Sequence, residues 1–215
     1  YKSDNDDLFE FDVSTRGNYL ILYREEIRKD ERFKVVSQTS LPLNENIEFK
    51  DCIDTKNSST EIDVVGETGD GLIVQSNFQA KNGALYAFNP NLKNQATLLV
   101  PENPAQILES WQFGEHILVS YMSGEENVLA KYDTNGVYQD ALKIEEGGMI
   151  DRITGSQKDE IVILSFASFY QATNFYSLNL STFKTEKTSV TSVNFNSKKF
   201  TTKKVNFYSK DSTII

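Results

Sequence analysis

The feature that most constrains the fold of this chain is a weak repeat of strand-like segments along its 215 residues. Four runs rich in β-branched and aromatic residues start 53, 45 and 44 positions apart, namely Asn18–Glu25, Gly71–Phe78, His116–Ser123 and Glu160–Ser168. Apolar and polar residues alternate in these runs, which predicts half-buried β-strands, and helical periodicity is nearly absent. A repeat of about 45 residues built from short strands is typical of the blades of a β-propeller.

Each of these runs is the second member of a group of four predicted strands. The third group shows this best, because its last two strands are joined by Asn135-Gly136, a dipeptide that favours tight hairpin turns. Its strands are Gln106–Phe113, His116–Ser123, Asn127–Asp133 and Val137–Ile144. The predicted strands of the first, second and fourth groups are Phe9–Val13, Asn18–Glu25, Phe33–Thr39 and Ile47–Ile53; Glu61–Gly66, Gly71–Phe78, Ala84–Asn89 and Thr97–Pro101; and Ile150–Gly155, Glu160–Ser168, Asn174–Leu180 and Lys184–Val190.

The sequence therefore predicts an all-β chain that forms a partial β-propeller of about four four-stranded antiparallel blades. The predicted blades occupy residues 1–56, 57–102, 103–146 and 147–192. A β-sandwich would explain the strands but not their regular repeat. The rhythm breaks after residue 192, and residues 193–215 are predicted to be a linker in which two strands, Lys203–Tyr208 and Thr213–Ile215, flank a turn at Ser209–Ser212.

Four blades cannot close a ring alone, so the outer faces of the first and last blades are expected to be open. Apolar sheet faces left in water tend to associate, and we therefore expect self-association through these open faces. The chain also starts at Tyr1 rather than at a methionine and stops within the apolar run Thr213-Ile214-Ile215. We therefore expect it to be a piece of a longer polypeptide.

The charge balance excludes two classes of partner. The formal net charge is −9, with 31 acidic side chains against 22 basic ones, which argues against binding to nucleic-acid phosphates or to anionic membrane surfaces. The longest apolar run, around Ile161–Leu164, is the size of a strand and far shorter than a membrane span. Cys52 is the only cysteine, so no internal disulfide can form, and we expect a cytoplasmic or periplasmic protein, with the cytoplasm favoured.

The reactive side chains form no catalytic or metal-binding pattern, and we expect neither a cofactor nor a metal ion. His116 starts a predicted strand without a second histidine or cysteine nearby, Cys52 is interpreted as a packed thiol, and Trp111 as part of the core or its rim. The run Asp4, Asn5, Asp6 and Asp7 resembles the start of a calcium loop but lacks its glycine and distal glutamate, so a solvated tail is favoured.

Two further clusters have structural interpretations. Gly147-Gly148 is interpreted as a turn, because no phosphate-binding pattern follows it. The basic cluster of Lys198, Lys199, Lys203 and Lys204 is interpreted as a solvated linker, with docking onto a neighbouring domain as the alternative.

Segments of the third and fourth predicted blades resemble the prolyl oligopeptidase family. The resemblance is carried by Leu118-Val119-Ser120-Tyr121, Asn127-Val128-Leu129 and Tyr132-Asp133, then by Gly155-Ser156-Gln157-Lys158-Asp159-Glu160-Ile161 and Ser165-Phe166-Ala167-Ser168-Phe169. The segment Val205–Thr213 is similar to the strand pair that leads from the propeller of that family into its peptidase domain. The similarity runs from about Pro101 to the end of the chain.

The resemblance implies a substrate-gating propeller portion of a serine peptidase that cleaves short peptides after proline. In that family the Ser-His-Asp triad belongs to an α/β-hydrolase domain, and the nucleophile lies on a Gly-x-Ser-x-Gly turn. This chain has no such motif and only one histidine, so the triad is expected beyond Ile215 and the chain alone is expected to be inactive. The resemblance also implies that Arg32 faces the substrate tunnel, where it could pair with a peptide carbonyl or carboxylate.

Two other functions stay open at this point. One is a non-catalytic propeller that acts as a scaffold for a protein partner. The other is a propeller enzyme with its own site on the central axis, which would need a pair of carboxylates that converge there. The sequence contains many carboxylates, but it places no such pair.

Overall fold

The computed structural model describes residues 8–28, 31–43, 47–55, 60–89, 96–124, 126–143, 148–169, 171–189, 199, 200, 203 and 205–213. These residues form sixteen strands in four separate four-stranded sheets, which we call blades 1 to 4 in chain order. The strands of blades 1 and 2 are β1 (Leu8–Val13), β2 (Tyr19–Arg28), β3 (Glu31–Ser40), β4 (Lys50–Thr55), β5 (Ile62–Glu67), β6 (Leu72–Ser76), β7 (Ala84–Phe88) and β8 (Ala96–Val100). The strands of blades 3 and 4 are β9 (Gln106–Phe113), β10 (His116–Ser123), β11 (Glu126–Asp133), β12 (Tyr138–Lys143), β13 (Gly148–Thr154), β14 (Ile161–Ser168), β15 (Gln171–Asn179) and β16 (Lys184–Ser189).

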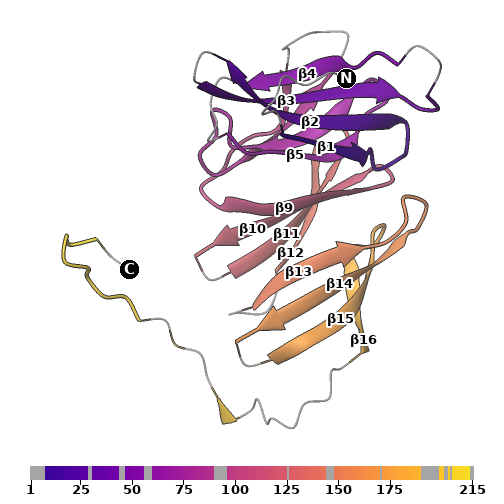
Figure 1. Cartoon of the computed structure of the whole chain (residues 1–215). Helices are drawn as coiled ribbons and strands as arrows, with labels where there is room; N and C mark the ends of the chain where they lie inside the picture. The colour runs from indigo at the N-terminus through magenta and orange to yellow at the C-terminus, as the bar shows by residue number, and fades with distance from the viewer. Residues whose placement is uncertain are drawn as a thin grey trace.

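Each blade is an antiparallel meander in which sequential strands are neighbours. The blades follow one another in chain order, from the indigo blade 1 to the orange blade 4 (Figure 1). The all-β fold and the four four-stranded antiparallel sheets are therefore confirmed. The four runs that define the repeat are β2, β6, β10 and β14, each the second strand of its sheet.

In blades 2 to 4 the second strand buries the most residues, because it lies inside its sheet and carries apolar residues on both faces; in blade 1 the third strand, β3, buries more. Three apolar clusters fill the spaces between successive blades, which we call the first, second and third seams. In the first seam, Ile21 and Val36 of blade 1 pack with Leu72 and Val74 of blade 2. The second and third seams are filled by the clusters that contain Ile73, Leu85, Ile107, Ile117 and Val119, and Leu118, Leu129, Ile153, Leu164 and Leu178.

The hairpin predicted at Asn135-Gly136 is present, with Gly136 but not Asn135 at positive φ. Gly136 has a φ of 78°, a conformation that glycine adopts without steric cost. The carboxylate of Asp133 accepts hydrogen bonds from the backbone N–H groups of Asn135 and Val137, both at 2.9 Å. This side chain therefore closes the turn that starts β12.

Two local predictions were wrong. Gly148 is the first residue of β13 rather than part of a turn, and a Cβ there would lie 1.9 Å from the ring of Phe166; the glycine is required by close packing, while Gly147 lies outside the described residues. The stretch predicted as a strand from Lys203 to Tyr208 has only an isolated bridge, at Tyr208. Among the described residues 203 and 205–208, no strand is present beyond this bridge.

The predicted turn in this terminal segment is present. The N–H of Ser212 donates to the carbonyl of Ser209, and Ser209 N–H donates to the carbonyl of Thr213. Of the second predicted strand, only Thr213 falls within the described residues. The yellow segment that holds this turn lies away from the four blades (Figure 1).

Candidate functional site: a central cavity closed by amide clamps

The first strands of three successive blades surround one cavity. Its volume is about 560 Å³, and its lining comes mainly from β5, β9 and β13. Since each of these strands is the first of its sheet and has one unpaired edge, the cavity lies along the inner edges of the blades. We call it the central cavity.

The innermost strands place one exposed carboxylate at an equivalent position in every blade. Glu10, Asp63, Glu109 and Asp151 each lie three or four residues before the end of β1, β5, β9 and β13. Asp63 and Glu109 line the central cavity. Two carboxylates in a recessed space create a negative potential, which attracts ammonium and guanidinium groups.

The proton affinities of two of these carboxylates respond to their surroundings. Partial burial raises the pKa of Asp63, and the negative charge of Glu61 raises it further, while Lys34 opposes the shift. Partial burial also raises the pKa of Glu109, against the opposing charge of Arg152, with smaller upward contributions from Asp151 and Asp63. The carboxylates of adjacent blades therefore influence each other across the cavity, a convergence that sequence reasoning could not place.

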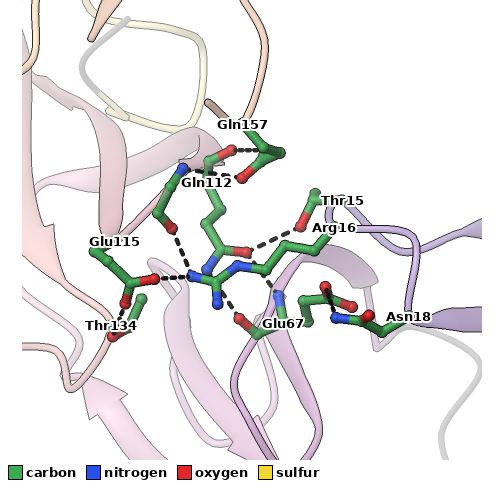
Figure 2. A network of polar contacts seen from close by, with 9 residues as sticks. Thr15, Arg16, Asn18, Glu67, Gln112, Glu115, Thr134 and Gln157 are labelled. Atoms are coloured by element: carbon green, nitrogen blue, oxygen red, sulfur yellow. Dashed lines mark hydrogen bonds and ion pairs between the residues drawn. The ribbon is translucent and has the colours of Figure 1, made fainter. Parts of the chain in front are cut away.

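A glutamine from blade 3 holds the end of the innermost strand of blade 2. Gln112 at the end of β9 is only 2% exposed. Its Nε2 donates to the carbonyl of Glu67 at 2.8 Å, and its Oε1 accepts from the N–H of the same residue at 2.8 Å. One side-chain amide thus satisfies both backbone groups of a buried residue, as a neighbouring strand would; we call this arrangement an amide clamp (Figure 2).

A second glutamine repeats the clamp one blade later. Gln157, in the turn between β13 and β14, donates through Nε2 to the carbonyl of Gln112 and accepts at Oε1 from the N–H of Gly114 at 2.9 Å. The two glutamines are 45 residues apart, which is the spacing of the blades. The second and third seams therefore close with the same device.

The hairpin between β1 and β2 joins blade 1 to the same network. The Thr15 hydroxyl donates to Gln112 Oε1 at 2.9 Å, and Arg16 Nη2 reaches both the carbonyl of Gly114 and the carboxylate of Glu115 at 2.7 Å. Asn18 Nδ2 donates to Glu67 Oε1 at 2.8 Å. Side chains and backbone groups of all four blades thus meet in one cluster (Figure 2).

Chain topology fixes the end of the blades at which this cluster lies. In a four-stranded meander, the turns after the first and third strands lie at one end, while the chain enters and leaves the blade at the other. The clamp residues lie at the ends of β5 and β9 and in the turns that follow β1, β9 and β13. The network therefore closes the end of the blades opposite to the one from which the chain leaves β16.

A buried lysine makes a third kind of contact between blades 3 and 4. Lys131 in β11 is 6% exposed, and its Nζ donates to the carbonyl of Leu180 at 2.8 Å. The same ammonium lies 5.1 Å from the centre of the Phe183 ring, within the range of a cation–π contact. The third seam is thus held by a clamp, an apolar cluster and this lysine.

The residues singled out from the sequence are dispersed. His116 is the first residue of β10, half-buried, and Trp111 packs partly buried against the apolar cluster of the third seam. Cys52 lies in the cluster of the first seam, 2% exposed, and burial raises the pKa of its thiol to about 12. The interpretation of Cys52 as a packed thiol is confirmed, and so is that of Trp111 as part of the core or its rim.

The other predicted residues are only partly described. Arg32 lies in β3 and pairs with Ile27 of β2, but its side chain lies outside the described residues, so its place in a tunnel stays a prediction. The acidic run from Asp4 to Asp7, and Lys198 and Lys204 of the basic cluster, also lie outside the described residues. Lys199 and Lys203 are exposed.

The two glutamines of the clamps were missed by sequence reasoning. A glutamine within a strand carries no signal by itself, and Gln157 stood out only as part of the segment that resembles the prolyl oligopeptidases. The recurrence of a glutamine at the blade spacing is the signal that could have found them. Within the described ranges, no group of three or more His, Cys, Asp or Glu side chains could hold a metal ion.

The fold and the site together define an array of four propeller blades around a recessed, acid-lined cavity. The chain matches the family described as the prolyl oligopeptidase N-terminal β-propeller domain over residues 1–191. It belongs to that family. A comparison with curated protein sequences finds no match.

Solved structures share this fold at low sequence identity. A structure from a study of two prolyl endopeptidases superposes with a TM-score of 0.81 at 19% identity, and prolyl oligopeptidase B from Galerina marginata, as the apo protein, with a TM-score of 0.78 at 17% identity. The same fungal protein bound to a 35mer hydrolysis and macrocyclization substrate matches equally well. In each case 97% of this chain is covered, and the chain spans 30% of the length of the solved chain.

Proposed function

We propose that this chain is the gating propeller portion of a prolyl oligopeptidase-type serine peptidase, in which a separate α/β-hydrolase domain of the same polypeptide carries the catalytic triad. The observation that carries the proposal is the family match over residues 1–191, combined with a central cavity that the innermost strands leave open. The proposed substrates are proline-containing peptides, cleaved after proline.

The described residues support a role in access rather than in chemistry. Acyl transfer by a serine peptidase needs a nucleophile whose base is within hydrogen-bonding distance. The only histidine of the chain is His116, and it lies half-buried at the start of β10. The central cavity instead offers walls formed by the innermost strands and two carboxylates, Asp63 and Glu109, which are elements of a selective passage.

The proposal concerns the size and charge of the peptides that pass. The fungal neighbour has been solved with a 35mer substrate, so a propeller of this fold is compatible with peptide substrates of that length. The carboxylates of the central cavity would favour peptides with a free amino group or with lysine and arginine side chains. We place the enzyme in the cytoplasm or the periplasm, and the lone unpaired thiol of Cys52 favours the cytoplasm.

The test compares the polypeptide that joins this propeller to its proposed peptidase domain with the 215-residue chain alone. Both are assayed on a chromogenic Gly-Pro reporter, with and without a serine-reactive phosphonate. The proposal expects cleavage by the longer polypeptide, its loss with the phosphonate, and no cleavage by the chain alone. If neither cleaves, the propeller is a scaffold for a protein partner; cleavage by the chain alone would place the chemistry within these blades.

A further inference from the structure

The three seams between the blades are not built alike. The second and third seams each contain an amide clamp, in which one glutamine holds both an N–H and a carbonyl of the preceding blade. Across the first seam, Asn18 bonds the side chain of Glu67, and the N–H of Val64 reaches the hydroxyl of Tyr23 at 3.4 Å. These are single bonds from one group to another, and the second is long for a hydrogen bond.

The innermost strand of blade 1 is also poorly packed against blade 2. Glu10 pairs with Tyr23 and Asp12 pairs with Ile21, and Ile21 belongs to the apolar cluster of the first seam. Directly paired residues of an antiparallel sheet project from the same face, so Glu10 and Asp12 face blade 2. Both are nevertheless exposed. Asp12 is the second-last residue of β1, whereas the second-last residues of β5, β9 and β13, namely Gly66, Gln112 and Ile153, are all buried.

A cavity occupies the place where this packing is missing. It has a volume of about 480 Å³ and lies between the starts of β1 and β5 and the hairpin formed by β2 and β3. Its lining includes Glu10, Asp12 and Tyr23 of blade 1 and Ile62 and Asp63 of blade 2. The gap is therefore on the inner side of the first seam, at the end of the blades away from the clamps.

Two other parts of the first seam are held firmly. At the clamp end, Thr15, Arg16 and Asn18 tie the first hairpin of blade 1 to blades 2 and 3. Farther from the axis, the apolar cluster of the first seam packs β2, β3 and β4 against β6. A body that is held at two places can still rotate about the line that joins them, so the remaining corner of the seam can open while both held places stay in contact.

We propose that blades 1 and 2 form a hinge, closed at the clamp network and at the apolar cluster, which opens along the inner starts of β1 and β5 and widens the central cavity. The opening end is the one from which the chain leaves β16, since the clamps close the opposite end. The second and third seams stay fixed during this motion because each is clamped.

The hinge deepens the proposed function, because under that function the opening end faces the peptidase domain. Widening there would admit a peptide or release its products without breaking the seams of blades 2 to 4. The existence of the hinge does not depend on peptidase activity, and its test reads distances in the chain rather than cleavage. Failure of the hinge and failure of the proposed function are therefore distinguishable.

The equivalent carboxylates of the four innermost strands provide matched probe positions. Three double-cysteine variants are made in a Cys52→Ser background, and both cysteines of each variant carry spin labels. The replaced pairs are Glu10 with Asp63 across the first seam, Asp63 with Glu109 across the second, and Glu109 with Asp151 across the third. Each pair removes two exposed carboxylates and spans one seam. We expect the distance distribution across the first seam to be at least twice as broad as across the second and third, and three distributions of equal width would overturn the hinge.

The native thiol tests whether the outer part of the first seam stays closed. Cys52 lies in the apolar cluster about which the blades would rotate, and it is the only cysteine of the chain. A hinge leaves this thiol covered, so a disulfide reagent should modify it at least a hundredfold more slowly than a cysteine placed at Glu10 in the Cys52→Ser background. Comparable rates would mean that blades 1 and 2 separate as a whole, which would also overturn the hinge.

Discussion

The clamp made by Gln112 offers a quantitative test of how the blades are joined. In Gln112→Met, a side chain of similar shape removes three hydrogen bonds, two to the backbone of Glu67 and one from Thr15. The N–H and carbonyl of Glu67 would then be left in a buried position without this partner. An unsatisfied buried polar group costs about 1–3 kcal/mol, so we expect a loss of about 3 kcal/mol in the free energy of unfolding.

This loss is large enough to measure in the whole chain. For a protein of this length, 1 kcal/mol lowers the melting temperature by about 2–4 °C, so Gln112→Met should melt about 6–12 °C below the parent. Circular dichroism follows all four blades, while the fluorescence of the single tryptophan, Trp111, reports on the third seam. Coincident transitions would show that the blades unfold as one unit.

The control is Gln106→Met, which changes an exposed glutamine of the same strand and should shift stability by less than about 0.5 kcal/mol. A double-mutant cycle with Gly66 tests the contact between the two residues, because a Cβ at Gly66 would lie 2.5 Å from Gln112 Oε1. Gly66→Ala should therefore destabilise the parent more than it destabilises Gln112→Ala. If Gln112→Met costs no more than Gln106→Met, the clamp does not hold the second seam.

Four further predictions follow from the same contacts. Asp63→Asn should raise the free energy of unfolding near neutral pH but not below about pH 3. The pKa of Asp63 is raised in the folded chain, so the free energy of unfolding falls as this carboxylate ionises, and asparagine avoids that loss. Urea titrations at the two pH values test this, and an equal gain at both would contradict it. Lys131→Met should cost about 1–3 kcal/mol through the lost bond in the third seam, whereas Lys184→Met, at an exposed lysine of β16, should cost less than about 0.5 kcal/mol. Similar melting temperatures would refute the difference. Gly71→Ala should cost more than about 3 kcal/mol, since its Cβ would lie 1.9 Å from a backbone carbonyl oxygen, whereas the same change at Gly69 meets nothing within 4 Å; thermal melts of the two variants decide. The chain should self-associate through the outer faces of blades 1 and 4, and a stable monomer in light scattering across a concentration series would contradict this.

The apolar residues behind the last prediction differ between the two outer faces. On blade 1, Phe9, Phe11 and Val13 lie on the side of β1 opposite to Glu10 and Asp12, and each is about half exposed. On blade 4, the corresponding exposed residues are Met149, Ile161 and Phe175. Since burial of apolar area drives association, changing Phe9 and Phe11 to serine should weaken self-association if the face of blade 1 takes part.

Membrane insertion by a helix has no support in the described part of the chain, where no helix is long and apolar enough to span a bilayer.

The sequence by itself determined the strands and their grouping. Alternation of apolar and polar residues located β10 to the residue, and the Asn135-Gly136 turn located the hairpin between β11 and β12. These signals are local, since side-chain alternation and turn preference depend on a few neighbouring residues. The same local signals failed among the described residues of 203–208, where Tyr208 forms only an isolated bridge.

Only the tertiary structure decided which polar residues matter. Gln112, Gln157 and Glu67 are ordinary polar residues in the sequence, and their roles arise because the ends of successive innermost strands meet in space. The same holds for Asp63 and Glu109, which share a cavity although 46 positions separate them. The local pattern of apolar and polar residues predicts which face of a strand is buried. Contacts between blades depend instead on how whole sheets pack, and this packing determines where the clamps and the cavity lie and how the first seam differs from the other two.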